Sequence, residues 1–474
     1  MNNIPKIQDA DLKGKVILIR VDHNVVKKGK IKDPYRIDAS LETIKMVFEK
    51  GGKPILMSHV GRPKNKKTGE IEISEKTAVG PIVDYLNNKL GKVFKTPEIL
   101  EEHCGNGYEN LDMIHPLLED LRNDKLDGIY LQNTRCFTGE ESGGEVSVEF
   151  GKKLSNIADI YINDAFGSWQ PHASTIEPTK YLPSFAGVLM QKEIANLDRV
   201  LNPERPLLAV VAGSKFDTKI GPLSSLLQKA DFLILGGVIY NAYLCAKYKI
   251  RIKGVSEDDI KAAENFLKIS DQFPGKIVEL PYIIESDLLE EKSKGNFRVH
   301  NIHTLKPQIE LNYILDVSQR SFAVNTIRDI FKNARTIFVN AVMGYTPNFS
   351  GGTIALNKII DENTDAAKLF GGGDTLQEFK TLLPEIYKKA LPDDKYYFFT
   401  GGGTILKAIK ENSATGLEPV QALIVNKKSR MKERRNITDR RQNQDRRKIT
   451  IPVKIERRNG RNRRNGIDRR SKSL

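Results

Sequence analysis

Short runs of β-branched and aliphatic residues recur along most of the chain, and segments with helical spacing lie between them. The runs are VILIRV from Val16, PILMS from Pro54, GIYL from Gly128, IYIN from Ile160, LLAVVA from Leu207, FLIL from Phe232, TIFVN from Thr336 and YYFFT from Tyr397. Each has the length and composition of a buried strand. One intervening segment places Ile37, Ile44 and Val47 on one helical face. Because strands that alternate with helices form parallel sheets covered on both faces, this pattern predicts an α/β fold.

The length of the chain indicates how many cores it holds. At 474 residues it exceeds what one hydrophobic core supports, so we expect two lobes and an appendage. In open parallel sheets, ligands bind beyond the carboxyl ends of the strands. Functional residues are therefore expected where the apolar runs end.

Cationic side chains follow the strands in the first half of the chain. They are Arg20, Arg36, His59, Arg62 and Arg135, and Asp22 and Asn24 follow the first strand. Arginine presents a fork of donors that matches carboxylate and phosphate oxygens, so this set suits a small organic phosphate. For any one arginine alone, an ordinary surface salt bridge is the common alternative. Recurrence at successive strand ends favours the binding site.

Glycine-rich turns follow the strands in the second half. GGGDT at 371–375 and TGGGT at 400–404 each follow an apolar strand and precede helical spacing. Glycines let backbone N–H groups and the positive end of a helix approach an anion, although tight turns use glycine as well. Two such turns, with Asp374 as a possible magnesium ligand, favour a metal nucleotide. Neither GxxxxGK[ST] nor GxGxxG occurs, so the P-loop and the dinucleotide fingerprint do not apply.

Two lysines follow the strand LLAVVA. Their spacing predicts Lys215 and Lys219 on one face of a helix start. There they would neutralise charge on a transferring phosphoryl group without a covalent intermediate. A pair of solvated lysines is the alternative.

Seven segments, in order, resemble the phosphoglycerate kinase family, and the resemblance runs from about residue 8 to 424. The segments are RVDHNV at 20–25, SHVGRPK at 58–64, NDAFG at 163–167, NPERP at 202–206, GSKFDTKIG at 213–221, FGGGDT at 370–375 and TGGG at 400–403. The resemblance implies two doubly wound, Rossmann-like parallel-sheet lobes joined by a hinge helix that contains Gln191 to Leu201. Its implied boundaries are 1–185 for the first lobe, completed by about 405–426, and 186–404 for the second.

The resemblance also implies roles for particular residues. The first lobe is expected to bind 3-phosphoglycerate or 1,3-bisphosphoglycerate through Asp22, Asn24, Arg36, His59, Arg62 and Arg135. The second lobe is expected to bind Mg²⁺ with ATP or ADP through Gly213, Lys215, Lys219, Gly237, Asn340, Gly372, Gly373, Asp374 and Thr375, with Asp374 as the metal ligand. During direct in-line transfer to or from a carboxyl group, a step of glycolysis, the migrating phosphoryl group is expected to be surrounded by Arg36, Lys215, Gly373 and Gly403.

Two segments depart from the family pattern. After NDAFG the family usually continues with His-Arg-Ala-His, whereas this chain has Gln170 and Pro171 and lacks the phosphate-binding arginine. Pro347 stands where the family has a ribose-contacting glutamate. These departures keep an alternative open: a weakened or inactive paralogue that binds nucleotide and uses its tail to bind an anionic partner.

The segment 427–474 carries the whole excess charge of the chain. It holds 20 Lys and Arg against 5 Asp and Glu, while positions 1–426 hold 55 of each. An acidic or amide residue followed by Arg-Arg recurs every six residues at Glu433, Asp439 and Asp445, and again at Glu456, Asn462 and Asp468. So few apolar residues predict disorder. Paired arginines suit nucleic acid, a nucleotide messenger or another polyanion.

The remaining expectations concern location and assembly. No uncharged run reaches the roughly 18 residues of a membrane span, and no secretory signal precedes the first strand, so we expect no transmembrane segment. Three cysteines cannot all pair, which favours a reducing cytoplasm. Resemblance to the family implies a monomer.

Overall fold

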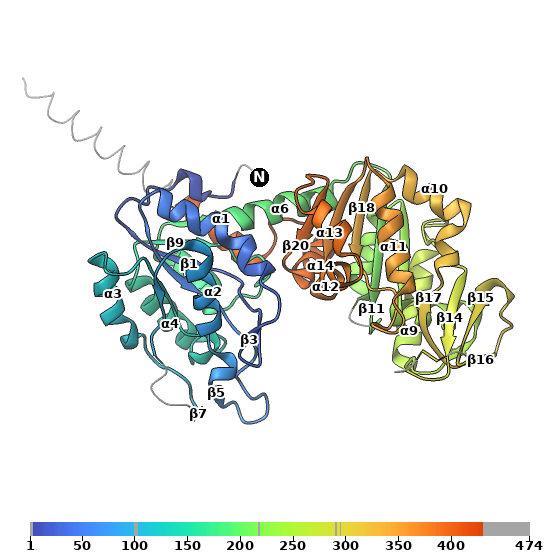
Figure 1. The fold of residues 1–474 in the computed structure, drawn as a ribbon, viewed down its shortest axis with the longest axis horizontal. Coiled ribbons are helices and arrows are strands. Elements are labelled where there is room, and N and C mark those ends of the chain that lie inside the picture. The colour runs from blue at the N-terminus through green and yellow to red at the C-terminus, as the bar shows by residue number, and fades with distance from the viewer. Residues whose placement is uncertain (1–2, 99–102, 217–218, 290–291, 294, 430–474) are drawn as a thin grey trace, which may run out of the picture. The chain divides into compact units, whose positions relative to one another are not determined.

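A computed structural model describes residues 3–98, 103–216, 219–289, 292–293 and 295–429 (Figure 1). Residues 1–427 form one compact unit. The expectations for the Arg-rich tail fall almost entirely on 430–474, outside the described residues.

The first sheet has six parallel strands, and the apolar runs of the first half supply its centre. Its order is β10 (Ser184–Ala186), β9 (Ile160–Asn163), β1 (Val16–Arg20), β4 (Lys53–Met57), β8 (Gly128–Tyr130) and β6 (Phe94–Lys95). The helices of this half are α1 (Tyr35–Glu49), α2 (Gly80–Leu90), α3 (His115–Arg122), α4 (Gly144–Asn156) and α5 (Ala173–Ile176). The strand order reverses at β1, where the chain places β4 on one side and β9 on the other.

The second sheet has five parallel strands. Its order is β12 (Phe232–Gly236), β11 (Leu207–Gly213), β18 (Thr336–Asn340), β19 (Ala367–Gly371) and β20 (Tyr396–Phe399). The helices of this half are α7 (Ile220–Lys229), α8 (Gly237–Tyr248), α9 (Glu257–Ser270), α10 (Asn325–Asn333), α11 (Gly351–Glu362), α12 (Gly373–Leu382), α13 (Pro384–Ala390) and α14 (Gly402–Glu411). The order reverses at β11, between β12 and β18.

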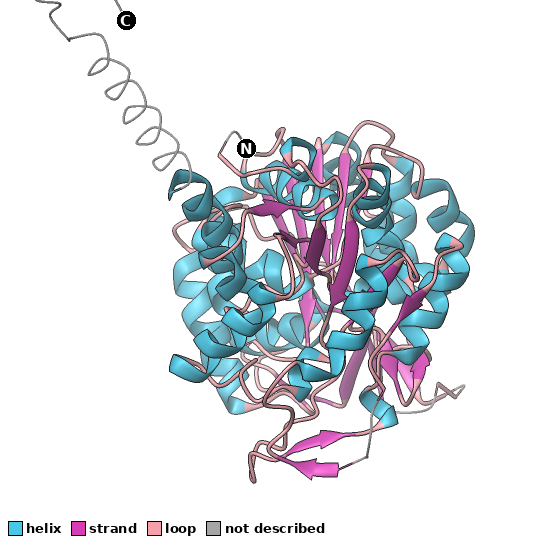
Figure 2. Cartoon of the chain, turned by 90° about the vertical axis from the view of Figure 1, so that its left-hand side faces the viewer, coloured by secondary structure: helices cyan, strands magenta, loops and turns pink. Residues whose placement is uncertain are grey.

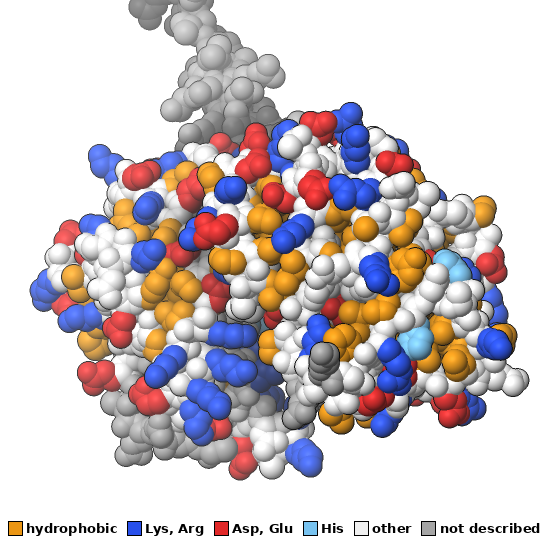
Figure 3. Space-filling model, turned by 45° about the vertical axis from the view of Figure 1, so that its right-hand side comes forward, with side chains coloured by type: hydrophobic (Ala, Val, Ile, Leu, Met, Phe, Trp, Pro, Cys, Tyr) orange, Lys and Arg blue, Asp and Glu red, His pale blue; other side chains and the backbone are white. Residues whose placement is uncertain are grey.

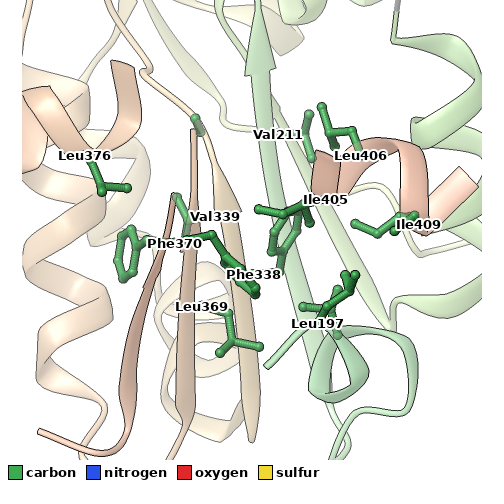
Figure 4. Close-up of a cluster of buried hydrophobic side chains, with 14 of the residues drawn as sticks. Leu197, Val211, Phe338, Val339, Leu369, Phe370, Leu376, Ile405, Leu406 and Ile409 are labelled. Carbon is green, nitrogen blue, oxygen red and sulfur yellow. The ribbon is translucent and has the colours of Figure 1, made fainter. Parts of the chain in front are cut away.

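All eight predicted strands are present, and the α/β class with two doubly wound parallel sheets is confirmed. Helices flank the strands (Figure 2). Strands covered on both faces need apolar residues throughout, and every residue of β1 and of β18 is buried. In the second sheet, Phe338 of β18 packs with Ile405 of α14 and Leu197 in one apolar cluster (Figure 4).

A helix links the two sheets. The helix α6 (Val188–Leu201) follows the last strand of the first sheet and precedes β11 (Figure 1). Its buried Glu193 accepts hydrogen bonds from the backbone N–H and the hydroxyl of Thr400, each at 2.8 Å. Asn426 hydrogen-bonds to Thr179 and Leu182 of the first half, and its side-chain oxygen accepts from Ser184. The lobe boundaries given above stay predictions.

A small antiparallel unit beside the second sheet was not predicted. It consists of β15 (Phe297–Asn301), β14 (Tyr282–Ser286) and β17 (Tyr313–Val317). Short pairs also form between β2 (Val26–Lys27) and β3 (Lys30–Ile31), β5 (Ile71–Ile73) and β7 (His103–Gly105), and β13 (Arg251–Ile252) and β16 (Glu310–Leu311). Among the described residues, no helix has both the length and the apolar character needed to cross a membrane.

Candidate functional site

A buried carboxylate and an arginine meet at the end of β1. Asp22 is 4% exposed, and its carboxylate lies 3.2 Å from a terminal nitrogen of Arg36 at the start of α1. Burial raises the pKa of Asp22, but the positive charges of Arg36 and Arg20 outweigh burial and hold that pKa below its ordinary value. Asp22 is therefore ionised at neutral pH and orients Arg36.

The fully buried Arg20 joins β1 to the end of β4. Its Nε donates to the hydroxyl of Ser174 at 2.8 Å, and a terminal nitrogen lies 3.0 Å from His59 Nδ1. Burial, followed by the charge of Arg20, lowers the pKa of His59. His59 is therefore neutral at pH 7, and its ring acts through hydrogen bonds and not through charge.

The turn at Gly61 gathers three more of the predicted substrate-binding residues. Its N–H donates to Asn24 Oδ1 at 2.9 Å, and its carbonyl accepts from Arg135 at 2.6 Å. Arg135 also pairs with Glu141 at 2.8 Å. Arg62 is the next residue and is exposed. The predicted residues of the first lobe thus form two connected groups at the carboxyl edge of the sheet, one around Asp22 and one around Gly61.

A cavity of about 1180 Å³ opens at the carboxyl edge of the second sheet. Of the predicted nucleotide-binding and catalytic residues, the cavity is lined by Gly213, Lys219, Gly237, Asn340, Gly372, Gly373, Asp374, Thr375 and Gly403. Arg36 of the first half lines the same cavity. Lys and Arg side chains gather beside a hollow on the face drawn in Figure 3. The cavity therefore brings residues from both sheets together.

Bare glycines line one end of this cavity. Gly372 has φ +114°, a conformation that side chains rarely adopt, and a Cβ there would lie 2.7 Å from Asn340 Nδ2. A Cβ on Gly402 would lie 2.5 Å from Gly372 Cα, so the two glycine turns touch. The helices α12 and α14 begin at these turns and aim their N-terminal N–H groups at the same region.

Asn340 connects β18 to both sides of the cavity. Its Oδ1 accepts from Lys219 Nζ at 3.0 Å, and its Nδ2 donates to the carbonyl of Gly371. Burial lowers the pKa of Lys219 from its ordinary value. An anion beside Lys219 would counter that effect, so the lysine is suited to bind phosphate.

The helix predicted to start at Lys215 does not form there, which corrects that expectation. The helix α7 begins at Ile220, and Lys215 lies in the preceding loop with an exposed side chain. It is not among the residues that line the cavity. The cause is Phe216, which is fully buried against Phe266 and whose N–H donates to Asp259 at 2.6 Å. This anchor separates Lys215 from Lys219.

Asp374 has the surroundings expected of a magnesium ligand in a metal nucleotide site. It lies in the first turn of α12 and lines the cavity, with Glu378 one helical turn later. Mg²⁺ in such sites takes one or two carboxylates and completes its shell with phosphate oxygens and water. Among the described residues no group of three metal-binding side chains occurs. The donor set thus fits an ion held mainly by the nucleotide.

Several cavity residues were missed from the sequence. They are Leu315, Asp316, Met343, Tyr345, Glu378, Lys407 and Lys410. Burial raises the pKa of Asp316 to about 7, and its carboxylate accepts from the N–H groups of Val317 and Gly352. Lys407 and Lys410 are three residues apart on one face of α14, a spacing that could have indicated them. The rest carry no local signal.

The two departures from the family pattern have separate surroundings. In the loop after β9, Gln170 Oε1 lies 3.0 Å from His172 Nε2. Burial lowers the pKa of His172. Pro347 is exposed and is not among the residues that line the cavity. Neither departure breaks the contacts around Asp22, Gly61 or Gly372.

The arginine-rich cluster lies on one parallel sheet and the glycine-lined cavity on another, with Arg36 shared between them. This arrangement suits a kinase, which transfers a phosphoryl group between two anionic substrates. A family model described as phosphoglycerate kinase matches residues 7–412. The chain is 32% identical over 422 residues to a phosphoglycerate kinase from Dictyoglomus turgidum, covering 88% of this chain and 98% of that protein. The chain belongs to the phosphoglycerate kinase family.

Solved structures are similar as well. Phosphoglycerate kinase from Coxiella burnetii is 28% identical with a TM-score of 0.69, covering 89% of this chain and 98% of that one. Phosphoglycerate kinase from Pyrococcus horikoshii OT3 has a TM-score of 0.71 over 90% of this chain and 100% of that one. At 22% identity, the second likeness bears on the fold alone. The chain is therefore a kinase whose reaction is reversible phosphoryl transfer between 1,3-bisphosphoglycerate with ADP and 3-phosphoglycerate with ATP.

Proposed function

We propose that the two site halves described above carry out this reaction by direct in-line transfer, with the carboxyl group of 3-phosphoglycerate as acceptor. One observation carries the proposal: Arg36, paired with Asp22 of the first sheet, lines the same cavity as Lys219 and the glycine turns of the second. An arginine in that position serves both substrates. No nucleophilic side chain is needed.

In the first half, phosphoglycerate is held by Asp22, Asn24, Arg36, His59, Arg62 and Arg135. The ion pair with Asp22 fixes the fork of Arg36, so little conformational entropy is lost when it binds an anion. The neutral ring of His59 and the exposed Arg62 supply further donors. Arg135 is oriented by Glu141 and by the carbonyl of Gly61.

In the second half, ATP or ADP occupies the cavity. Its phosphates lie at Gly213, Lys219, Gly237, Asn340, Gly372, Gly373 and Thr375, where backbone N–H groups and helix N-termini favour anions. Asp374 would hold Mg²⁺, which supplies charge neutralisation on the phosphates when bound. Leu315, Met343 and Tyr345 offer apolar surface in the same cavity.

The transferring group is stabilised where the two halves meet. A carboxylate oxygen of 3-phosphoglycerate bonds to the γ-phosphorus as the bond to the β,γ-bridging oxygen breaks, and ADP leaves. Arg36 and the N–H groups at Gly373 and Gly403 face the charge on the equatorial oxygens. Lys215, which is exposed in this structure, would join them only on a movement of its loop. Removing water by lobe closure protects the transfer.

A coupled assay tests the proposal. The full-length protein is incubated with ATP, MgCl₂ and 3-phosphoglycerate, and 1,3-bisphosphoglycerate is reduced by a coupling dehydrogenase. Turnover that requires both substrates supports the proposal. Turnover no higher than in the absence of 3-phosphoglycerate supports the alternative, a paralogue that binds nucleotide without turning over phosphoglycerate.

The tail, residues 427–474, is proposed to bind nucleic acid, a nucleotide messenger or another polyanion. It holds 20 basic and 5 acidic residues, whereas the rest of the chain has no net charge. Full-length protein and a chain ending at 429 are compared for binding to a DNA oligonucleotide and to heparin at several salt concentrations. A salt-dependent loss of binding on truncation supports the proposal, and equal binding contradicts it. Buried free thiols at Cys136 and Cys245 support a cytoplasmic, reducing location, and we propose a monomer.

A further inference from the structure

The loop after β9 borders the phosphoglycerate site but offers no cation of its own. Positions 164–172 read DAFGSWQPH and contain neither Lys nor Arg. Its histidine, His172, is bonded to Gln170, and burial lowers its pKa. A Cβ on Gly167 would lie 2.1 Å from Asp22 Oδ2, so the loop abuts the partner of Arg36. A phosphate or carboxylate there needs a positive charge from elsewhere.

Trp169 of this loop reaches the second half of the molecule. A Cβ on Gly401 would lie 2.6 Å from Gly167 Cα, which shows how closely the loop approaches the start of α14. A Cβ on Gly403 would lie 3.9 Å from Trp169 Nε1. The indole is half-buried and packs against the core. The loop and the N-terminus of α14 therefore form one continuous wall.

Lys407 of α14 lies at this wall with its charge over the indole. Its ammonium is 5.5 Å from the centroid of the Trp169 ring. It also lines the cavity shared with Arg36 and pairs with Glu411 one turn further along the helix. An ammonium group has three N–H donors, so the contacts with Glu411 and the indole leave Lys407 a donor for a further anion while its stem is held. The geometry thus aims a cation from the second half toward the cation-free loop of the first.

We propose that Lys407 binds an anionic oxygen of phosphoglycerate, and that Trp169 is the positioning residue that holds Lys407 there. The inference rests on the proposed function, and it adds a substrate contact from α14 to the residues proposed above. In this chain, Lys407 would supply the positive charge that the loop after β9 lacks.

The test begins with the wild-type enzyme in the coupled assay. Absence of turnover there would remove the proposed function, whereas turnover leaves only the inference at stake. Lys407→Met keeps the stem and removes the charge, and we expect the KM and Kd for 3-phosphoglycerate to rise about tenfold or more, with the KM for ATP within about twofold. Lys407→Arg should retain most of the affinity. Lys388→Met, at an exposed lysine of α13 paired with Glu385, is the matched control and should change neither constant.

Glycerate and glycerol 3-phosphate then identify which end of the substrate Lys407 contacts. The analogue that carries the contacted group should lose affinity in Lys407→Met, and the other should not. If neither analogue nor 3-phosphoglycerate binds more weakly in Lys407→Met, or if only ATP does, the proposal is wrong.

Trp169 is the sole tryptophan, so its fluorescence reports on the pair directly. We expect 3-phosphoglycerate to change the emission of the wild type and to change it less in Lys407→Met. Trp169→Leu should weaken 3-phosphoglycerate binding less than Lys407→Met does, and the double variant should bind no worse than Lys407→Met alone. Fully additive effects would contradict the positioning role of Trp169. A fall in thermal stability without any change in substrate affinity would show that the pair is only structural.

Discussion

The two halves of the site are built from different materials. In the first half, charged side chains hold one another: Asp22 holds Arg36, and Glu141 holds Arg135. In the second half, the cavity is lined mainly by glycine backbone and helix N-termini, and Asn340 connects them through hydrogen bonds to Lys219 and Gly371. Recognition by side chains can tolerate a replacement that restores the charge, whereas the backbone half has no room for a Cβ at Gly372 or Gly402.

This contrast bears on one of the two departures from the family pattern, the altered loop at Gln170 and Pro171. Gln170 and Pro171 alter a loop of the side-chain half, and Lys407 can supply charge from across the site. The glycines at 371–373 and 401–403, by contrast, are all present. No other residue type can replace Gly372 or Gly402 without changing the shape of the turns that line the cavity.

The largest expected effect follows from removing the arginine that both halves share. Arg36→Met should lower kcat about 10²- to 10³-fold, because Arg36 faces charge that develops in transfer. It also leaves the buried Asp22 without its partner, which should lower the free energy of unfolding by about 1–3 kcal/mol. Steady-state kinetics and urea unfolding measure the two effects separately.

Arg328→Met, at an exposed ion pair with Glu362, is the control and should lower the free energy of unfolding by less than about 1 kcal/mol. A kcat within threefold of wild type in Arg36→Met would contradict the shared role.

The next largest effect concerns the backbone half. Gly372→Ala forces a side chain into φ +114° and sets its Cβ 2.7 Å from Asn340 Nδ2, a strain of about 1–3 kcal/mol. We expect the KM for ATP to rise at least tenfold while the Kd for 3-phosphoglycerate is unchanged. Gly80→Ala, at a helix start where a Cβ would meet nothing within 4 Å, should leave both constants unaltered. Normal ATP affinity in Gly372→Ala would show that the turn does not cradle phosphate.

A third prediction tests the contact between the halves through the pH dependence of stability. Burial raises the pKa of Glu193 in α6 to about 8, despite the hydrogen bonds from Thr400. The folded state therefore keeps a proton that the unfolded chain releases above about pH 4.5, so this group's stabilisation falls as pH rises from there to about 8. Glu193→Gln removes this titration. The free energy of unfolding of the wild type should fall relative to Glu193→Gln, by up to about 1.4 kcal/mol per pH unit.

Other titrating groups cancel in that comparison because both proteins contain them. Asp198→Asn, on the exposed side of the same helix, should follow the wild type. If the difference in the free energy of unfolding between Glu193→Gln and wild type does not vary between pH 5 and 8, Glu193 is not a buried, protonated carboxyl group at this contact.

Much of the fold could be predicted from the sequence because buried parallel strands and amphipathic helices leave clear periodic patterns. The residues at strand ends, such as Asp22 and Asp374, could be predicted for the same reason, since parallel strands end at one edge. The antiparallel strand β15 escaped because its side chains are largely exposed and its FRVHN sequence lacks an apolar run. Local patterns reveal where a strand lies only when one or both faces are buried.

The parts of the site that depend on tertiary contacts could not be predicted. Lys215 was placed on a helix because helical spacing is a local signal, whereas the anchoring of Phe216 by Asp259 and Phe266 is not. The contact of Trp169 with Lys407 joins residues far apart in the sequence, and neither residue type alone indicates the other.

Separate binding measurements on two variants test the division between the halves most directly. Calorimetric titration of Arg62→Met and of Gly372→Ala, each with 3-phosphoglycerate alone and with ADP alone, gives four dissociation constants to compare with wild type. The structure predicts that Arg62→Met loses affinity for 3-phosphoglycerate only and Gly372→Ala for ADP only. Loss of both ligands to the same extent in either variant would contradict a side-chain half for phosphoglycerate and a backbone half for nucleotide.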